Sequence, residues 1–133
     1  YLLDATQDPV KEVLGLTGQN GAPLVVDTVG GSSSTIDQAL EMVRPGGQIT
    51  KVGWFMKTTN TTLDTLIRKN VRLQGSFSHT HDMWKESINL ISGGKINLKK
   101  MISKVLPLKD WRYGFELCYT RQALKVILKP EQD

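Results

Sequence analysis

The stretch Pro23-Leu-Val-Val-Asp-Thr-Val-Gly-Gly31 decides the fold, because a short apolar run that ends in glycine precedes a helical pattern. A second run, Pro45-Gly-Gly-Gln-Ile-Thr-Lys-Val-Gly-Trp54, follows that helix and also ends in glycine. A strand, a helix and a strand in this order predict a parallel pair. Both strands then end at one rim of the sheet, where open α/β sheets bind ligands. The pattern indicates the second half of a doubly wound α/β domain.

Local signals predict the bounds of the first two helices. Asp8 and Pro9 are typical of a helix start, and the glycines of residues 18–21 are expected to end that helix. Ser33 or Ser34 is expected to cap the next helix. The buried face of this second helix repeats every three or four residues. Its members are Ile36, Ala39, Leu40 and Val43.

The strand patterns of residues 24–26 and residues 71–77 differ from each other. Leu24-Val25-Val26 is continuous, which is typical of a central parallel strand covered on both faces. Residues 71–77 alternate instead, which predicts one buried and one partly open face, with Val71, Leu73, Gly75 and Phe77 together. This makes them a candidate edge strand that pairs with a second subunit, giving a homodimer or tetramer. A helix around residues 62–69 is expected to bury Leu63, Leu66 and Ile67.

The pattern changes beyond His81, where the elements are expected to be an addition to the sheet domain. A helix is predicted to end at the glycines of residues 93–94, and short strands are predicted over residues 101–106 and 123–128. The first helix has an apolar stripe of Trp84, Ile88 and Ile91. Asp110 is expected to cap a second helix. Its apolar stripe is Trp111, Phe115 and Cys118, with the thiol expected in the core.

Composition narrows the class of protein. The net charge of +4 is uneven, since residues 1–50 carry two basic and six acidic side chains. The basic residues of the other part are scattered, without the clustering of a nucleic-acid reader, and no apolar run has the length of a membrane span. The single cysteine suits a reducing compartment, so a cytoplasmic location is expected. Because the chain starts at Tyr1 without methionine, we expect a piece of a longer protein that is inactive alone.

Two potential signals are weak or missing. No Gly-x-Gly-x-x-Gly occurs in the sequence, and no acidic residue follows one to bind a ribose. His79 and His81 stand close together, but two imidazoles do not complete a metal site, even with Asp82 nearby. We therefore predict no metal ligands in this chain, and a substrate-pocket or interface position for the two histidines.

Six short segments resemble medium-chain, zinc-containing alcohol and polyol dehydrogenases, especially the sorbitol and iditol dehydrogenase-like branch. The segments occur in the family's order over essentially the whole chain: Val26-Asp-Thr-Val-Gly30, Met42-Val-Arg-Pro-Gly-Gly47, Val52-Gly53, Leu73-Gln-Gly-Ser-Phe77, Val105-Leu-Pro-Leu108 and Leu124-Lys-Val-Ile-Leu-Lys129. The resemblance implies the second half of a Rossmann-type doubly wound parallel sheet over residues 1–78. It implies that residues 79–133 are a return segment of the catalytic domain. Where Ser78 stands, many polyol dehydrogenase-like sequences carry arginine.

The resemblance also implies the residues that bind a nicotinamide dinucleotide. Contacts to its ribose and adenine side are expected from Thr28, Val29 and Gly30. Contacts to its nicotinamide end are expected from Val52, Gly53, Trp54, Ser76, Phe77 and Ser78. Lys125 is expected to face the pyrophosphate. From residue types alone, Gly30 serves equally well as a turn, Lys125 as a solvated lysine, and Trp54 and Phe77 as core.

The implied activity is hydride transfer from a secondary alcohol or polyol to NAD or NADP in the longer protein. Zinc would assist this reaction through ligands that lie outside this chain. A zinc-free medium-chain quinone or enone reductase is a second interpretation. A non-catalytic module for nucleotide binding or dimerisation is a third. No catalytic residue is predicted within these 133 residues.

Overall fold

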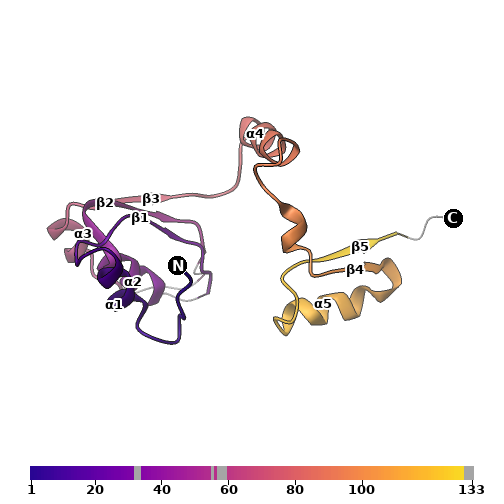
Figure 1. Ribbon diagram of the computed structural model, residues 1–133, viewed down its shortest axis with the longest axis horizontal. Helices are drawn as coiled ribbons and strands as arrows, with labels where there is room; N and C mark the ends of the chain where they lie inside the picture. The colour runs from indigo at the N-terminus through magenta and orange to yellow at the C-terminus, as the bar shows by residue number, and fades with distance from the viewer. Residues whose placement is uncertain (32–33, 55, 57–59, 131–133) are drawn as a thin grey trace. The chain divides into compact units, whose positions relative to one another are not determined.

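A computed structural model describes residues 1–31, 34–54, 56 and 60–130. The chain forms two compact units, Tyr1–Ser78 and His79–Asp133. Among the described residues, the first unit holds three helices and three strands, and the second holds the remaining elements (Figure 1). The assignment of the units to a dinucleotide-binding and a catalytic domain stays a prediction.

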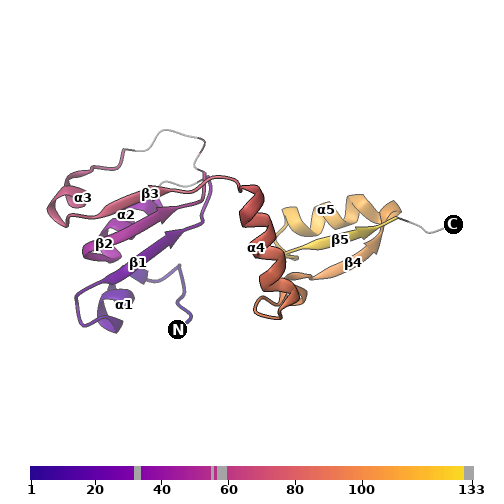
Figure 2. The ribbon, with the colours of Figure 1, turned by 90° about the horizontal axis from the view of Figure 1, so that it is seen from above.

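The first unit alternates helices and strands. Its elements are α1 (Pro9–Leu16), β1 (Ala22–Asp27), α2 (Ser34–Met42), β2 (Val43–Lys51), α3 (Asp64–Arg68) and β3 (Arg72–Gly75). The strands form one parallel sheet in the order β1-β2-β3. Figure 1 shows α1, α2 and α3 on the same side of this sheet, and Figure 2 shows the sheet from above. The parallel pair predicted from the two glycine-ended runs is confirmed.

The core of the first unit lies between α2 and the sheet. All four residues of the predicted α2 face are buried, although Val43 is the first residue of β2 and not part of the helix. Ile49 and Val71 complete the cluster. The helical spacing predicted this face correctly because it depends only on which side chains share one side of a helix.

The capping predictions for the first two helices have different outcomes. Asp8 caps α1 as predicted, since its Oδ1 accepts a hydrogen bond from the backbone N–H of Lys11 at 3.1 Å, and Pro9 begins the helix. Ser34 is the first residue of α2, and Ser33 lies outside the described residues. The helix start at Asp8 is therefore the local signal that the structure confirms.

Burial on the strands differs from the prediction. Leu24 and Val26 are about half exposed, and β1 lies at an end of the described sheet with β2 at its centre. The expectation of a central strand covered on both faces is therefore wrong for β1, because the helices of this unit lie on one face (Figure 1). The predicted buried face of residues 71–77 is also wrong beyond Val71, since all four residues of β3 are exposed.

Two further observations concern α3 and the edge strand. Leu66 packs against the core, but Leu63 and Ile67 are exposed, because α3 has only five residues and turns one side chain toward α2 and the sheet. Within the described residues β3 pairs with β2 alone, so it is an edge strand as predicted. Its pairing with a second subunit stays a prediction.

The second unit contains a helix followed by a small parallel sheet. Its elements are α4 (His81–Ser92), the 3₁₀ turn η1 (Leu98–Met101), β4 (Lys104–Pro107), the 3₁₀ turn η2 (Leu108–Asp110), α5 (Trp111–Tyr119) and β5 (Val126–Lys129). β4 and β5 pair in parallel. Gly114 and Leu117 are the buried residues of α5, and a Cβ at Gly114 would lie 3.1 Å from the Val126 side chain. The small residue therefore lets α5 pack closely on β5.

Two predictions for the second unit are wrong, the cap at Asp110 and the core position of Cys118. Trp111, Phe115 and Cys118 are exposed, because α5 turns Gly114 and Leu117 toward the sheet instead. Asp110 makes no capping hydrogen bond, since the preceding 3₁₀ turn runs directly into the helix and leaves Asp110 outside the extended conformation of a cap. The apolar stripe of α4 is exposed as well. Among the described residues, no helix has the length and apolar character needed to cross a membrane.

Candidate functional site: the rim of the three-stranded sheet

The carboxyl ends of β1 and β2 are joined at one rim of the sheet. The backbone N–H groups of Val52 and Gly53 both donate to the carbonyl oxygen of Asp27, at 2.8 and 3.0 Å. The N–H of Gly31 donates to the carbonyl oxygen of Trp54 at 3.1 Å. The segments that follow the two strands therefore run side by side, as the shared glycine endings predicted.

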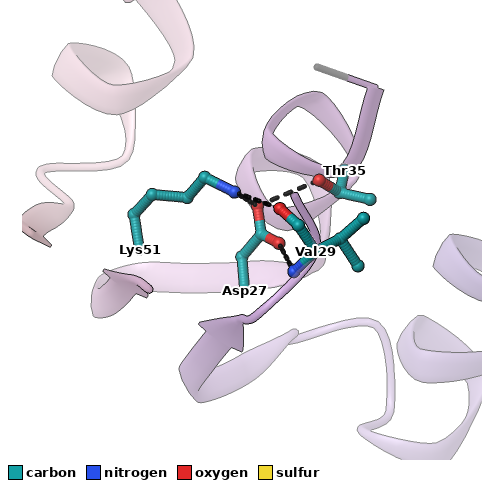
Figure 3. Close-up of polar contacts among 4 residues, drawn as sticks. All are labelled: Asp27, Val29, Thr35 and Lys51. Carbon is teal, nitrogen blue, oxygen red and sulfur yellow. Dashed lines mark hydrogen bonds and ion pairs between the residues drawn. The ribbon is translucent and has the colours of Figure 1, made fainter. Parts of the chain in front are cut away.

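A buried carboxylate lies at the centre of this rim (Figure 3). Asp27 is 5% exposed and forms an ion pair with Lys51, whose Nζ lies 2.9 Å from Asp27 Oδ2. The same carboxylate accepts hydrogen bonds from the Thr35 hydroxyl and from the Val29 N–H, both at 3.0 Å. Thr35 is in the first turn of α2, where the helix dipole favours a negative charge. Asp27 thus links β1, β2 and α2.

The surroundings of Asp27 act on its pKa in opposite directions. Burial raises the pKa, whereas the hydrogen bonds from Lys51, Val29 and Thr35 and the positive charge of Lys51 lower it. The net result is a pKa below the ordinary value of 3.8. The carboxylate is therefore ionised at neutral pH and stabilises the folded state there.

Glycine is needed where the two rim segments touch. A Cβ at Gly53 would overlap the carbonyl oxygen of Val29, and a Cβ at Gly30 would lie 3.1 Å from the carbonyl oxygen of Trp54. Residue type alone allowed Gly30 to serve only in a turn. In the structure it also lets the backbone of the neighbouring segment approach closely. Gly53 has the stricter requirement of the two.

An open hollow of about 480 Å³ lies at the ends of β2 and β3. Five predicted site residues line it together with Lys51 and Gly75: Val52, Gly53, Trp54, Ser76 and Phe77. The rings of Trp54 and Phe77 meet edge to face with centroids 5.6 Å apart, and both are largely exposed. The Ser76 N–H donates to the Lys51 carbonyl oxygen at 2.9 Å, which ties the β3 end to β2. An apolar wall with backbone polar groups is suited to a flat ring that carries an amide.

A second, smaller hollow of about 190 Å³ lies between β1 and α2. Thr28 and Val29 line it, together with Thr35 and Gln38 of α2. The predicted residues at the end of β1 therefore face a different depression from those at the ends of β2 and β3. Gly30 lies beside Trp54 at the boundary between the two segments.

Three predicted site residues line neither hollow: Gly30, Ser78 and Lys125. Ser78 is exposed, has a positive φ of 60° and lines neither hollow. Lys125 belongs to the second unit, where it is exposed and its carbonyl oxygen accepts a hydrogen bond from the Ser103 N–H at 2.8 Å. The cofactor-binding roles of all ten predicted site residues remain predictions.

The two histidines form no metal cluster. In the part of the chain that the structure describes, no group of three histidine, cysteine or acidic side chains is placed to hold an ion. The His79 ring instead packs edge to face on Trp84, with centroids 4.8 Å apart. The described residues therefore do not fit a zinc centre.

Sequence reasoning missed the polar centre of the rim, Asp27, Thr35 and Lys51. The signal was available, because Asp27 and Lys51 are the last residues of their strands and are paired in register. Opposite charges at equivalent ends of adjacent parallel strands predict an ion pair. Thr35 carried no comparable signal, since its contact depends on how α2 packs.

The fold and the rim define a dinucleotide-binding type of sheet, and comparison with known proteins identifies the family. The model of the family described as "Zinc-binding dehydrogenase" matches residues 1–93. The chain belongs to this zinc-binding dehydrogenase family, as the sequence resemblance indicated.

Individual relatives agree. The chain is 29% identical over 129 residues to the zinc-type alcohol dehydrogenase-like protein YdjL of Escherichia coli, covering 97% of this chain. It is 30% identical over 129 residues to the D-arabitol-phosphate dehydrogenase of Enterococcus avium, covering 95% of this chain. In both cases the match spans 36% of the relative's length.

A solved structure shows the same fold. The alcohol dehydrogenase TADH from Thermus sp. ATN1 superposes with a TM-score of 0.84 at 29% identity, over 95% of this chain and 37% of that protein. The predicted fold class is confirmed: the chain corresponds to the C-terminal, Rossmann-like part of alcohol dehydrogenases.

Proposed function

We propose that the whole protein is an NAD(P)-dependent dehydrogenase that takes hydride from a secondary alcohol or polyol. The observation that carries this proposal is the rim: two glycine-ended parallel strands in backbone contact beside a hollow lined by Trp54 and Phe77. Membership of the zinc-binding dehydrogenase family supports the reaction type, and the D-arabitol-phosphate dehydrogenase relative supports a polyol. The same membership favours this function over a zinc-free reductase.

The residues of this chain would bind and orient the dinucleotide. Backbone groups of Val52–Trp54 and Ser76 other than those bonded within the rim would fix the carboxamide. Trp54 and Phe77 would exclude water from one side of the ring. Because Gly53 has no Cβ, the carbonyl oxygen of Val29 can approach its backbone closely, and the two rim segments stay in contact. Both NAD and NADP are proposed as cofactors.

Zinc enters this proposal only through the family. Bound in the whole protein, zinc would stabilise the developing alkoxide as a Lewis acid. The described residues offer no set of ligands for it, so we assign none of them to the metal.

Two further parts of the proposal concern assembly and location. The outer edge of β3, which has no partner strand among the residues that the structure describes, would pair with the same strand of a second copy and give a dimer. A cytoplasmic location would suit Cys118, an exposed free thiol.

Calorimetric titration of the whole protein with NADH and with NADPH tests the proposed function. Saturable binding is expected, and Trp54→Ala should weaken it because the ring forms a wall of the larger hollow. Trp111→Ala in the second unit is the matched control, since this exposed ring is outside both hollows. Oxidation of secondary alcohols, followed by the absorbance of the reduced nicotinamide, then tests the reaction. Absence of binding to either dinucleotide would refute the proposal.

A further inference from the structure

We propose that Asp27 and Lys51 are positioning residues that hold Val29, and with it the segment after β1, in the geometry that accepts the dinucleotide. The inference rests on the proposed function. The observation behind it is that the two members of one ion pair bind both polar backbone groups of a single rim residue.

The two contacts are direct (Figure 3). Asp27 Oδ1 accepts the N–H of Val29 at 3.0 Å, and Lys51 Nζ donates to the carbonyl oxygen of Val29 at 2.9 Å. The ion pair itself spans 2.9 Å. The peptide groups on both sides of Val29 are thus oriented by side chains from two different strands.

Fixing the Val29 carbonyl also sets the spacing between the two rim segments. That oxygen lies against Gly53, at the place where a Cβ would stand in any other residue. A shift of the Val29 peptide would therefore move the segment beside Gly53 as well. Both segments belong to the predicted cofactor contacts, so the pair acts on both through one peptide.

The burial of the pair suits a fixed geometry. The side chain of Asp27 is 3% exposed and that of Lys51 is 17% exposed, so solvent screens their attraction less than that of a surface pair. Thr35 holds the same carboxylate oxygen from α2, which keeps the carboxylate in one orientation. A mobile segment would otherwise have to be ordered when the ligand binds, at a cost in affinity.

The test compares three substitutions in the whole enzyme. Lys51→Met removes the donor to the Val29 carbonyl oxygen, and Asp27→Asn removes the negative charge that holds Lys51. Lys51→Arg keeps a cation that can reach both Asp27 Oδ2 and the Val29 carbonyl oxygen. Lys51→Met and Asp27→Asn should each raise the Kd for NADH by about tenfold, in line with loss of a charge-assisted hydrogen bond. Lys51→Arg should retain most of the affinity for NADH. The KM for the dinucleotide should rise while kcat changes less.

Lys69→Met is the matched control for a purely structural effect. Like Lys51, Lys69 donates from Nζ to backbone carbonyl oxygens, three in this case. These carbonyls lie at the end of α2, away from the rim hollows. This variant should lower the melting temperature and leave the Kd for NADH within twofold of the unsubstituted value. If Lys51→Met fails to fold, Asp27→Asn still provides the comparison.

Two outcomes would overturn the inference, and they differ. If the unsubstituted enzyme binds NADH and both rim variants bind it equally well, the positioning role is wrong and the proposed function stands. If the unsubstituted enzyme does not bind NADH, the proposed function fails and the inference fails with it.

Discussion

The ammonium nitrogen of Lys69 lies 2.8 Å from the carbonyl oxygen of Leu40, across 29 positions of the sequence. It donates in the same way to Glu41 at 2.8 Å and to Val43 at 2.9 Å. These carbonyls belong to the last turn of α2 and the residue after it, where a helix leaves its acceptors without internal partners. One side chain from the end of α3 therefore closes the end of another helix.

Replacing Lys69 with methionine should destabilise the first unit by about 1–3 kcal/mol, because three backbone carbonyl oxygens, two of them in partly buried contacts, lose this donor. Urea denaturation monitored by circular dichroism measures this change. Lys11→Met on the exposed side of α1 is the control and should change the stability by less than about 0.5 kcal/mol. Equal effects from the two substitutions would contradict a capping role for Lys69.

Alanine at Gly53 should displace the rim, since its Cβ would overlap the carbonyl oxygen of Val29. Backbone rather than a flexible side chain is in the way, so we expect a loss of about 2–4 kcal/mol in the free energy of unfolding. Thermal denaturation provides the measurement.

Gly75→Ala is the control for this prediction. It lines the same hollow, but a Cβ there would meet no atom within 4 Å. Its stability should be close to that of the unsubstituted protein. A Gly53→Ala protein as stable as the Gly75→Ala protein would mean that the rim segments separate at little cost.

Stability should fall in acid partly through Asp27. Its pKa in the folded state is below the ordinary value of 3.8, so its stabilising contribution is present above that pH. Below 3.8 the unfolded chain binds the proton first, and the contribution is lost as the pH falls through the lower folded-state pKa.

Urea midpoints measured from neutral pH down to acid test this. Asp27→Asn should be less stable than the unsubstituted protein at neutral pH, and its midpoint should fall less over the acid range. Asp37→Asn, a change at an exposed carboxylate of α2, is the control and should keep the original pH profile. Parallel profiles for the Asp27→Asn and unsubstituted proteins would show that the ion pair does not couple to folding.

The edge strand gives a prediction on assembly. If β3 pairs with its counterpart in a second copy, Gln74→Lys should shift the sedimentation coefficient toward that of a monomer, because like charges would meet across the new sheet. Gln7→Lys makes the same change at an exposed site before α1 and should leave the sedimentation coefficient unchanged. An intact dimer in the Gln74→Lys protein would argue against this interface.

The order of elements could be predicted from the sequence because its signals are local. The cap at Asp8, the spacing of Ile36, Ala39 and Leu40, and the glycine endings near Gly30 and Gly53 each depend on a few neighbouring residues. The structure confirms those features. Five of the predicted site residues also line one hollow, and their role in cofactor binding stays a prediction.

Burial could not be predicted in the same way, because it depends on what packs on each face. Leu24 and Val26 have the residue types of a covered strand but are half exposed. In α5 the small residue Gly114 is buried and the aromatic Phe115 is exposed, since close packing on β5 selects the face without bulk. Apolar character alone therefore did not identify the inner face.

The exposed thiol of Cys118 gives this chain a single reactive position for chemical labelling. The sequence has one cysteine, and it lies in the second unit, whereas Trp54 lies at the rim of the first. A maleimide dye on Cys118 would accept excitation energy from Trp54 once Trp84 and Trp111 are replaced by phenylalanine. Energy transfer would then report in solution how the separation of the two units responds to a bound dinucleotide.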